Sequence, residues 1–341
     1  MPAMADICRA LQDCCRRKDP QAGRRIYCLL TQNSCESVAP LADHIIRVLS
    51  SSGNLQDSCK VFCYVPKPSI YTWTALISAH VELNDSLIAL HLHQGMQASD
   101  LHPDRVMFLC VLKACSSMGA LQYGRLIHHQ VMEYGFDTDV VVGNTLVDMY
   151  AKCKDFDEAT AWFHSLPHHS VVSWSALIAG FARHGYGEDA LDCFTAMQGE
   201  GFRCSKDMFL CILKVCSSGE AIGEGMEIHD QVVRQGHETD VLIGSTLIDM
   251  YSKCHCLEAA RKVFEMMPTR NEVSWGALIT GYAQHGYGRE VVQLFDEMKR
   301  GKAVPNKITY VSVLSACSRA GLINEGRRLF SSMEHDHGII P

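Results

Sequence analysis

A period of 101 residues runs through this chain of 341 residues. The segment VSWSALIAGFARHGYGEDAL around Trp174 returns as VSWGALITGYAQHGYGREVV around Trp275, and in a more diverged form as YTWTALISAHVELNDSLIAL around Trp73. Other residues share this spacing: Pro66, Pro167 and Pro268, and also Cys14, Cys115, Cys216 and Cys317. A fixed period across the whole chain predicts an elongated array in which each unit contacts its neighbours.

Each period of 101 residues contains three units, and the 35-residue unit that includes Trp174 has two helical patterns separated by a turn. The first has the i, i+3, i+4, i+7 spacing of a buried helix face, in Trp174, Leu177, Ile178 and Phe181. The second stripe consists of Ala190, Leu191, Phe194 and Met197. Between them, Gly185 is expected to be a left-handed cap, and its counterparts Gly286 and Asn84 are residue types that tolerate this conformation. Neither helix buries its apolar face alone, so such units must stack.

Applied along the chain, this helix–turn–helix unit gives ten repeats with lengths of 35, 31 and 35 residues in rotation. The predicted repeats are 4–38, 39–69, 70–104, 105–139, 140–170, 171–205, 206–240, 241–271, 272–306 and 307–341. In the 31-residue units the second helix is shorter and is expected to close on Pro66, Pro167 or Pro268, because proline cannot continue a helix. The expected fold is an all-α, right-handed α-solenoid of about twenty helices.

The composition suits such an array, since 47% hydrophobic residues supply a continuous core. No apolar run of about 18 residues is present, so no membrane helix is expected. Of the seventeen cysteines, eight recur at equivalent repeat positions: Cys14, Cys115, Cys216 and Cys317, Cys110 and Cys211, and Cys153 and Cys254. These are predicted to be small core residues of a reduced compartment. Zinc is not expected at Cys254-His255-Cys256, because the counterpart Cys153-Lys154-Asp155 lacks the pattern.

The ends of the chain carry no visible targeting segment. The first residues, MPAMADICRALQDC, already follow the repeat pattern, with neither an apolar signal core nor an Arg/Ser-rich presequence. The last residues, HDHGIIP, also end within the pattern. Both ends are therefore expected to be cut or to belong to a truncated gene product.

Two helical-repeat families have units of about this length. A tetratricopeptide unit has about 34 residues and a W-x2-L-G-x2-Y start. Leu177 fits this start, but Ile178 replaces its glycine, and the rotation of lengths does not suit a 34-residue unit. The chain instead resembles the pentatricopeptide repeat proteins of plants, in their variant with alternating long, short and standard repeats. The resemblance covers essentially residues 4–341, and it is carried by NTLVDMYAKCKDFDEA, STLIDMYSKCHCLEAARKVFEMMP and VSVLSACSRAGLINEGRRLFSSM.

This resemblance implies sequence-specific binding of single-stranded RNA, with one base per repeat. In the family, the fifth residue of a repeat reads the base together with the last residue, and an amide or hydroxyl can hydrogen-bond a base where an aliphatic group cannot. The candidate base-reading pairs are Thr74 with Asp104, Asn144 with Ser170, Ser175 with Ser205, Ser245 with Asn271, and Gly276 with Asn306. The pair Asp43 and Ser69 departs from the pattern and is assigned no base. The long repeats hold Cys8, Leu109, Leu210 and Val311 at the fifth position and are not expected to select a base.

The family's pairing rules imply a target sequence. Three pairs resemble readers of one base each: Thr74/Asp104 of guanine, Asn144/Ser170 of cytosine, and Ser245/Asn271 of adenine. Two weaker pairs lean towards purines: Ser175/Ser205 and Gly276/Asn306. Because the family binds RNA parallel to the chain, the expected site reads 5′-NNGNCRNARN-3′. The plain alternative is that the fifth position simply faces solvent.

Two further repeat positions are expected to contact RNA. The second residue of a repeat would wedge between neighbouring bases, at Val106, Val141, Val172, Leu242, Val273 and Ile308, although Asp207 breaks this rule. The alternative for these side chains is packing between adjacent repeats. The thirteenth residue would contact phosphate, at Arg16, Lys152, Arg183, Lys253 and Arg319. The alternative for these cations is to complement the helix dipole. A net charge of −7 does not exclude RNA, because the sign that matters is local to the groove.

No catalysis and no cofactor are predicted. Relatives with this rotation of repeats often carry a C-terminal extension, which in some ends in a zinc deaminase-like domain. Such a domain needs His-x-Glu followed by Pro-Cys-x-x-Cys. His80-Val81-Glu82 is the only His-x-Glu of the chain, it falls within a predicted helix, and no Cys-x-x-Cys is present.

Three interpretations follow. The first is an RNA-specificity factor for editing or other processing of a mitochondrial or chloroplast transcript, with editing-complex proteins or a deaminase supplied in trans as candidate partners. The second is a helical-repeat scaffold for protein–protein interaction, without an RNA target. The third is a truncated, degenerate family member without a stable target, which the diverged repeats 4–38 and 39–69 suggest.

Overall fold

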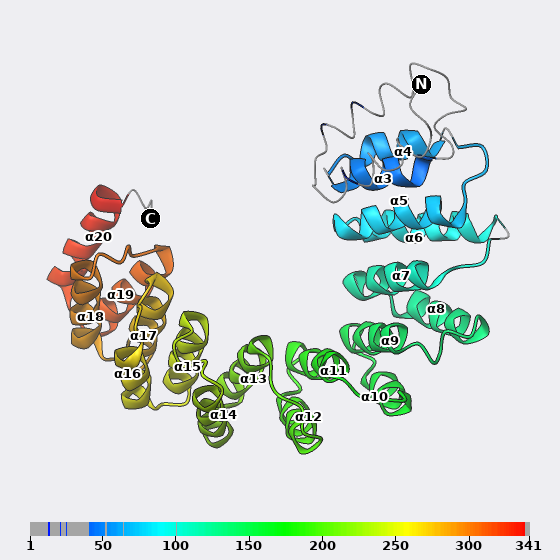
Figure 1. Cartoon of the computed structure of the whole chain (residues 1–341). Coiled ribbons are helices and arrows are strands. Elements are labelled where there is room, and N and C mark those ends of the chain that lie inside the picture. The colour runs from blue at the N-terminus through cyan, green and yellow to red at the C-terminus, as the bar shows by residue number, and fades with distance from the viewer. Residues whose placement is uncertain are drawn as a thin grey trace. The chain divides into compact units, whose positions relative to one another are not determined.

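The computed structural model describes residues 41–51, 53–63, 65–99 and 101–337, together with the single residues Asp13, Gln21 and Arg25. In these ranges the chain forms eighteen helices and no strand, with the helices labelled α3 to α20 in Figure 1. The predicted all-α class is therefore confirmed. The predictions for Cys8, Cys14 and Arg16 lie outside the described residues.

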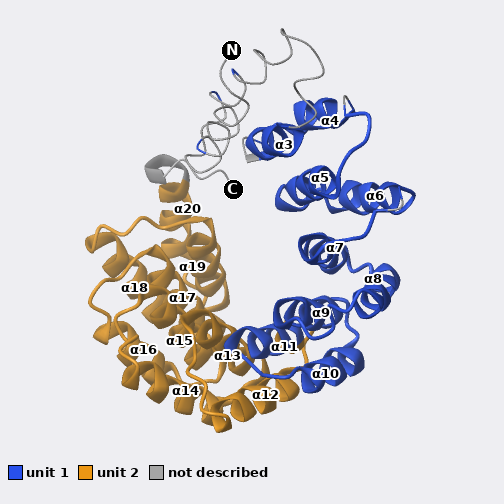
Figure 2. Cartoon of the chain, turned by 45° about the vertical axis from the view of Figure 1, so that its right-hand side comes forward, with its two compact units in different colours: residues 1–180 blue, residues 181–341 orange. Residues whose placement is uncertain are grey.

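The helices belong to two compact units, residues 1–180 and 181–341 (Figure 2). The helices of the first unit are α3 (Ala42–Ser51), α4 (Leu55–Cys63), α5 (Ile70–Glu82), α6 (Ser86–Gln97), α7 (Arg105–Met118), α8 (Leu121–Glu133), α9 (Val140–Lys152) and α10 (Phe156–Ser165). Helix α11 (Val171–Arg183) begins in the first unit and ends in the second. The second unit continues with α12 (Gly187–Gly199), α13 (Lys206–Gly219), α14 (Ile222–Arg234), α15 (Val241–Lys253), α16 (Leu257–Met266), α17 (Glu272–Gln284), α18 (Gly288–Arg300), α19 (Lys307–Arg319) and α20 (Ile323–His337).

Within each unit, the helices pack as two layers of a solenoid. In the first unit α5 packs against α3 and α7, its neighbours in the layer of odd-numbered helices, and against α6, which follows it in sequence. In the second unit α15 packs in the same way against α13, α17 and α16. The odd-numbered helices therefore form one layer and the even-numbered helices the other, as expected for stacked helix–turn–helix units.

Local sequence accounts for the helix ends. Gly185 and Gly286 have φ of 83° and Asn84 has φ of 60°, so the predicted left-handed turns are confirmed. The second helices that precede the recurring prolines are also short, as predicted. Helices α4, α10 and α16 have 9 or 10 residues, and each ends two or three residues before Pro66, Pro167 or Pro268.

A repeated aromatic contact joins each short second helix to the first helix that follows. The ring centroids of Phe62 and Trp73 lie 4.6 Å apart, those of Phe163 and Trp174 4.5 Å apart, and those of Phe264 and Trp275 4.6 Å apart, all edge to face. Such pairs contribute beyond the area that they bury. The tryptophan that marks the period is therefore a packing residue between neighbouring repeats.

Cysteines contribute to the same core. Cys115 and Cys216 are fully buried and Cys317 is 2% exposed, which confirms the predicted core role of this repeat position. Cys153 and Cys254 direct their thiols to the carbonyl oxygens of Cys115 and Cys216, at 3.9 and 3.7 Å.

Among the described residues, no helix has the length and apolar character that a membrane span needs.

Candidate functional site

The last residues of the eight predicted repeats from 39–69 to 272–306 each cap the first helix of the next repeat. Each side-chain oxygen accepts a backbone N–H of the first helical turn at 2.8 to 3.3 Å, in Ser69, Asp104, Asp139, Ser170, Ser205, Asp240, Asn271 and Asn306. This capping role was not among the sequence predictions. Its signal is visible in the sequence, because Ser, Asp and Asn directly before an apolar helical pattern are typical N-caps.

In three of these capping residues, one polar atom of the side chain takes no part in the cap. In Asn271 and Asn306 the amide oxygen accepts the capping bonds, and the Nδ2 group has no hydrogen-bond partner among the described residues. Asp104 caps α7 through Oδ1, and its Oδ2 likewise has no partner in the described part of the chain. The caps fix the orientation of these groups at the N-terminus of each first helix.

Two of the candidate base-reading residues at the fifth repeat position are buried. Thr74 is 4% exposed and Ser245 is 5% exposed, so the alternative that this position simply faces solvent is wrong for both. Oγ1 of Thr74 and Oδ1 of Asn144 are buried without a hydrogen-bond partner among the described residues. Buried polar atoms are nearly always paired in folded proteins, so these two unpaired atoms are exceptions within the core.

The remaining fifth residues differ from these. Ser175 and Ser245 donate their hydroxyls to the carbonyl oxygens of Val171 and Val241, at 2.5 and 2.7 Å, and keep lone pairs that accept. Gly276 offers no side chain, and a Cβ there would lie 3.6 Å from Oγ1 of Thr309.

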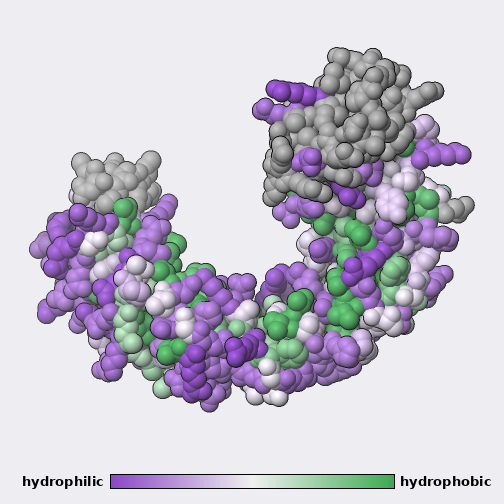
Figure 3. All heavy atoms as spheres, viewed as in Figure 1, coloured by the Kyte–Doolittle hydropathy of each residue, from purple (hydrophilic) through white to green (hydrophobic). Residues whose placement is uncertain are grey.

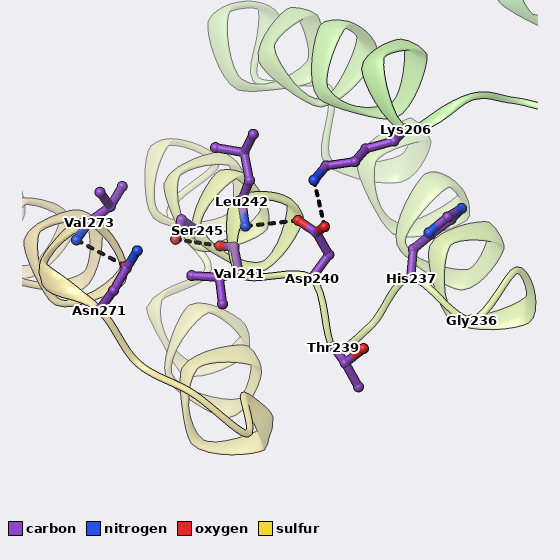
Figure 4. A pocket seen from close by; sticks show the side chains of 10 residues that line it. All are labelled: Lys206, Gly236, His237, Thr239, Asp240, Val241, Leu242, Ser245, Asn271 and Val273. Carbon is purple, nitrogen blue, oxygen red and sulfur yellow. Dashed lines mark hydrogen bonds and ion pairs between the residues drawn. The ribbon is translucent and has the colours of Figure 1, made fainter.

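One cavity in the second unit brings several predicted residues together (Figure 4). It measures about 590 Å³ and is lined by Ser245 and Asn271, the predicted adenine-reading pair, and by Leu242 and Val273, the second residues of two successive repeats. Leu242 and Val273 are 51% and 49% exposed. Lys206 also lines the cavity and binds Asp240 with an Nζ–Oδ2 distance of 2.6 Å. Apolar faces, a polar edge and a cation therefore meet in a space of nucleotide size.

A second cavity lies in the first unit. It measures about 450 Å³, and its lining includes Thr74, Val106, Arg47 and Glu82, but not Asp104. Sequence reasoning missed one exposed second residue, which lies on helix α5. Tyr71 is the second residue of the predicted repeat 70–104 and is 61% exposed, and the register that selected Val106 also selects it.

The second residues reach solvent in every repeat where they were predicted to act as wedges. Val106, Val141, Val172, Leu242, Val273 and Ile308 are between 46% and 70% exposed. Figure 3 shows that the face drawn there is mostly hydrophilic and is interrupted by small clusters of hydrophobic side chains. Packing between adjacent repeats therefore buries only part of the surface of each of these six side chains.

Three of the four described thirteenth residues have partners within the protein. Lys152 pairs with Asp148 at 2.7 Å and Lys253 pairs with Asp249 at 2.8 Å, each one helical turn apart. Arg319 donates to the carbonyl oxygen of Ala283, while Arg183 is exposed. The carboxylates offset two of the charges that were predicted to contact phosphate.

The histidines considered for catalysis or metal binding contact other residues of the protein. His80, of the His-x-Glu sequence, is 2% exposed, and its ring nitrogens contact Asp85 at 3.1 Å and Cys59 at 3.7 Å. His255 and His285 hydrogen-bond each other at 2.9 Å. In the ranges that the structure describes, no group of three or more His, Cys, Asp or Glu side chains is placed to hold a metal ion.

Stacked helical hairpins with polar and apolar residues at fixed positions of each first helix define a helical-repeat protein. Three family models, all of pentatricopeptide repeats, match the chain. The model described as PPR repeat family matches residues 270–319, and the one described as pentatricopeptide repeat domain matches 65–118. The model described as PPR repeat matches residues 144–171, 172–202, 245–271 and 308–337. The chain therefore belongs to the pentatricopeptide repeat family.

Relatives of known sequence agree with this family. The pentatricopeptide repeat-containing protein CRR2, chloroplastic, of Arabidopsis thaliana is 36% identical over 96% of this chain and 51% of its own length. Another chloroplastic pentatricopeptide repeat-containing protein of that plant is 34% identical over 97% of this chain and 62% of its own. The chain thus spans about half the length of the curated relatives that it matches.

Solved structures show the same fold. The pentatricopeptide repeat protein PPR10 in complex with an 18-nt psaJ RNA element is similar over 87% of this chain and 46% of its own, with a TM-score of 0.71 and 18% identity. A crystal structure of the pentatricopeptide repeat protein PPR10 from maize gives a TM-score of 0.64 and 15% identity over 100% of this chain and 55% of its own. The predicted α-solenoid fold is confirmed.

Proposed function

We propose that this protein binds single-stranded RNA sequence-specifically, with one base per repeat. The observation that carries the proposal is the cavity that brings Ser245, Asn271, Leu242 and Val273 together. A base inserted there lies between the exposed side chains of Leu242 and Val273, with its edge towards Ser245 and Asn271. The likeness to the RNA complex of PPR10 supports the fold that this arrangement needs.

The polar edge of this cavity has a defined hydrogen-bonding pattern. Oγ of Ser245 donates to Val241 and therefore accepts from a ligand, whereas Nδ2 of Asn271 is a free donor. Adenine offers an N6 donor beside an N1 acceptor, which complements this order, whereas guanine offers an O6 acceptor beside an N1 donor. Cytosine presents the same order as adenine, and the family resemblance favours the purine.

The finer assignments extend this proposal. The ten repeats with the boundaries given above belong to the long, short and standard variant, and the first helices begin at the predicted first residues Ile70, Arg105, Val140 and Val171, and likewise in later repeats. The protein acts without catalysis of its own as a specificity factor in editing or other processing of an organellar transcript. Chloroplastic relatives support an organelle, either chloroplast or mitochondrion. Editing-complex proteins or a deaminase in trans would then supply the chemistry.

The double substitution S245T/N271D is expected to change the preferred base at the eighth place from adenine to guanine. The aspartate keeps the N-cap but replaces the Nδ2 donor with an acceptor, and the new pair reproduces Thr74 with Asp104. We expect at least about a tenfold reversal in the affinity ratio, because a mismatched base leaves a buried polar group unpaired. The measurement is filter binding to two RNAs that differ only at the eighth place.

The third place of the same RNAs is the internal control, because Thr74 and Asp104 remain unchanged. The double variant should still prefer guanine there, as the unmodified protein does. An unchanged preference for adenine at the eighth place would contradict the assignment of Ser245 and Asn271.

A further inference from the structure

An ion pair joins the first and last residues of two long repeats. In the repeat 105–139, Arg105 binds Asp139 through two contacts, Nε to Oδ2 at 2.7 Å and Nη2 to Oδ1 at 3.2 Å. In the repeat 206–240, Lys206 binds Asp240 at 2.6 Å. The first residues of the short and standard repeats are Ala39, Ile70, Val140, Val171, Val241 and Glu272, none of them a cation.

The ion pair occupies the carboxylate that would otherwise read a base. Oδ1 of Asp139 already accepts the N–H groups of Val141 and Val142, at 2.9 and 3.0 Å, as the cap of α9. Arg105 then engages both oxygens, so each has a protein partner. In Asp240, Oδ1 caps α15 and Oδ2 binds Lys206, and the hydrogen bond from Lys206 together with the backbone bonds lowers the pKa of Asp240 below its usual value.

Asp104 shows what the carboxylate does without a cation. It is the last residue of the standard repeat 70–104, and it caps α7 through Oδ1 at 2.8 Å. The first residue of that repeat is Ile70, which cannot pair, and Oδ2 has no hydrogen-bond partner among the described residues. The same residue type at the same repeat position is therefore open in a standard repeat and closed in two long repeats.

We infer that Arg105 and Lys206 are positioning residues that withdraw Asp139 and Asp240 from base reading, so that these long repeats span a nucleotide without selecting it. This inference rests on the proposed function. The aliphatic fifth residues Leu109 and Leu210 act in the same direction, since they have no hydrogen-bonding group. Two features thus confine base selection to short and standard repeats: the aliphatic fifth residue and the ion pair on the last residue of the long repeats. Only the first is evident from the sequence.

The repeat 105–139 gives the cleaner test, because its flanking second residues Val106 and Val141 are both apolar and about half exposed. The double variant R105I/L109T gives this repeat the combination found naturally at Ile70, Thr74 and Asp104. The single variant L109T supplies the hydroxyl but keeps the ion pair. The variant R105K/L109T keeps a cation, and therefore a partner for Asp139.

Each protein is titrated with four RNAs that differ only at the fourth place. The unmodified protein, L109T and R105K/L109T are expected to bind all four within about twofold, whereas R105I/L109T should prefer guanine by about tenfold. A structural role of Arg105 alone would change the affinity for all four RNAs equally. Circular dichroism melts compare the folding of the four proteins.

Two results would overturn the inference: equal guanine preference in L109T and R105I/L109T, or no preference in a folded R105I/L109T. The third place separates these results from failure of the proposed function. If the unmodified protein shows no guanine preference at the third place, the proposed function fails, and the inference fails with it.

Discussion

The substitution F163A is expected to lower the free energy of unfolding by about 3–5 kcal/mol. Phe163 is fully buried in α10, packs edge to face on Trp174 of α11, and stacks on His169 with ring centroids 4.2 Å apart. Removing the ring leaves a cavity at the contact that joins two successive repeats. Urea unfolding followed by circular dichroism measures the loss.

Two matched variants test the cause. In F163L most of the apolar volume remains, so a loss of about 1–2 kcal/mol is expected. F330A removes a phenylalanine that is 48% exposed, and its effect should stay below about 1 kcal/mol. If F163A and F330A have equal effects, the aromatic contact does not hold the repeats together.

Acid is expected to destabilise the first unit through His93. The imidazole is fully buried, its Nδ1 lies 2.9 Å from the hydroxyl of Tyr123, and its Nε2 has no hydrogen-bond partner among the described residues. Burial lowers the pKa of His93 from 6.5 to about 4. The unfolded chain therefore binds the proton more readily, so the stability is complete above pH 6.5 and is lost as the pH falls towards 4. The loss is about 3 kcal/mol, measured by urea unfolding at pH 7 and pH 4.

The variant H93Q tests this assignment, because glutamine does not titrate in this range. Its unfolding free energy should fall less between the two pH values than that of the unmodified protein. H168Q, at an exposed position, should retain the full loss. His128 and His229 bind Tyr150 and Tyr251 in the same way, and burial lowers their pKa values too, so some loss should remain in H93Q. An undiminished loss in H93Q would show that His93 is not the group responsible.

Much of the fold could be predicted from sequence because its determinants are local. The apolar spacing from Trp174 to Phe181 fixes a buried helix face, and Gly185 or Asn84 fixes the turn after it. The recurring prolines limit the short second helices. Repetition then fixes the stacking, because every unit must cover the same apolar face of its neighbour.

The site was less predictable, because its side chains have partners far away in sequence or have two roles. Arg105 meets Asp139 across 34 positions, and no local pattern marks that contact. Burial of Thr74 depends on neighbouring first helices that sequence spacing does not place. The pairing of Lys152 with Asp148 could have been predicted, because residues four apart on a helix are neighbours.

The most direct test of the proposed function is selection from RNAs with random ten-nucleotide cores by the purified chain at about physiological salt. Base reading by successive repeats predicts enrichment of guanine, cytosine and adenine at the third, fifth and eighth places. Binding without enrichment would leave only a charged surface, because phosphate contacts carry no sequence information. If the folded protein binds no RNA, the proposed function is wrong and a protein-interaction scaffold becomes the better interpretation.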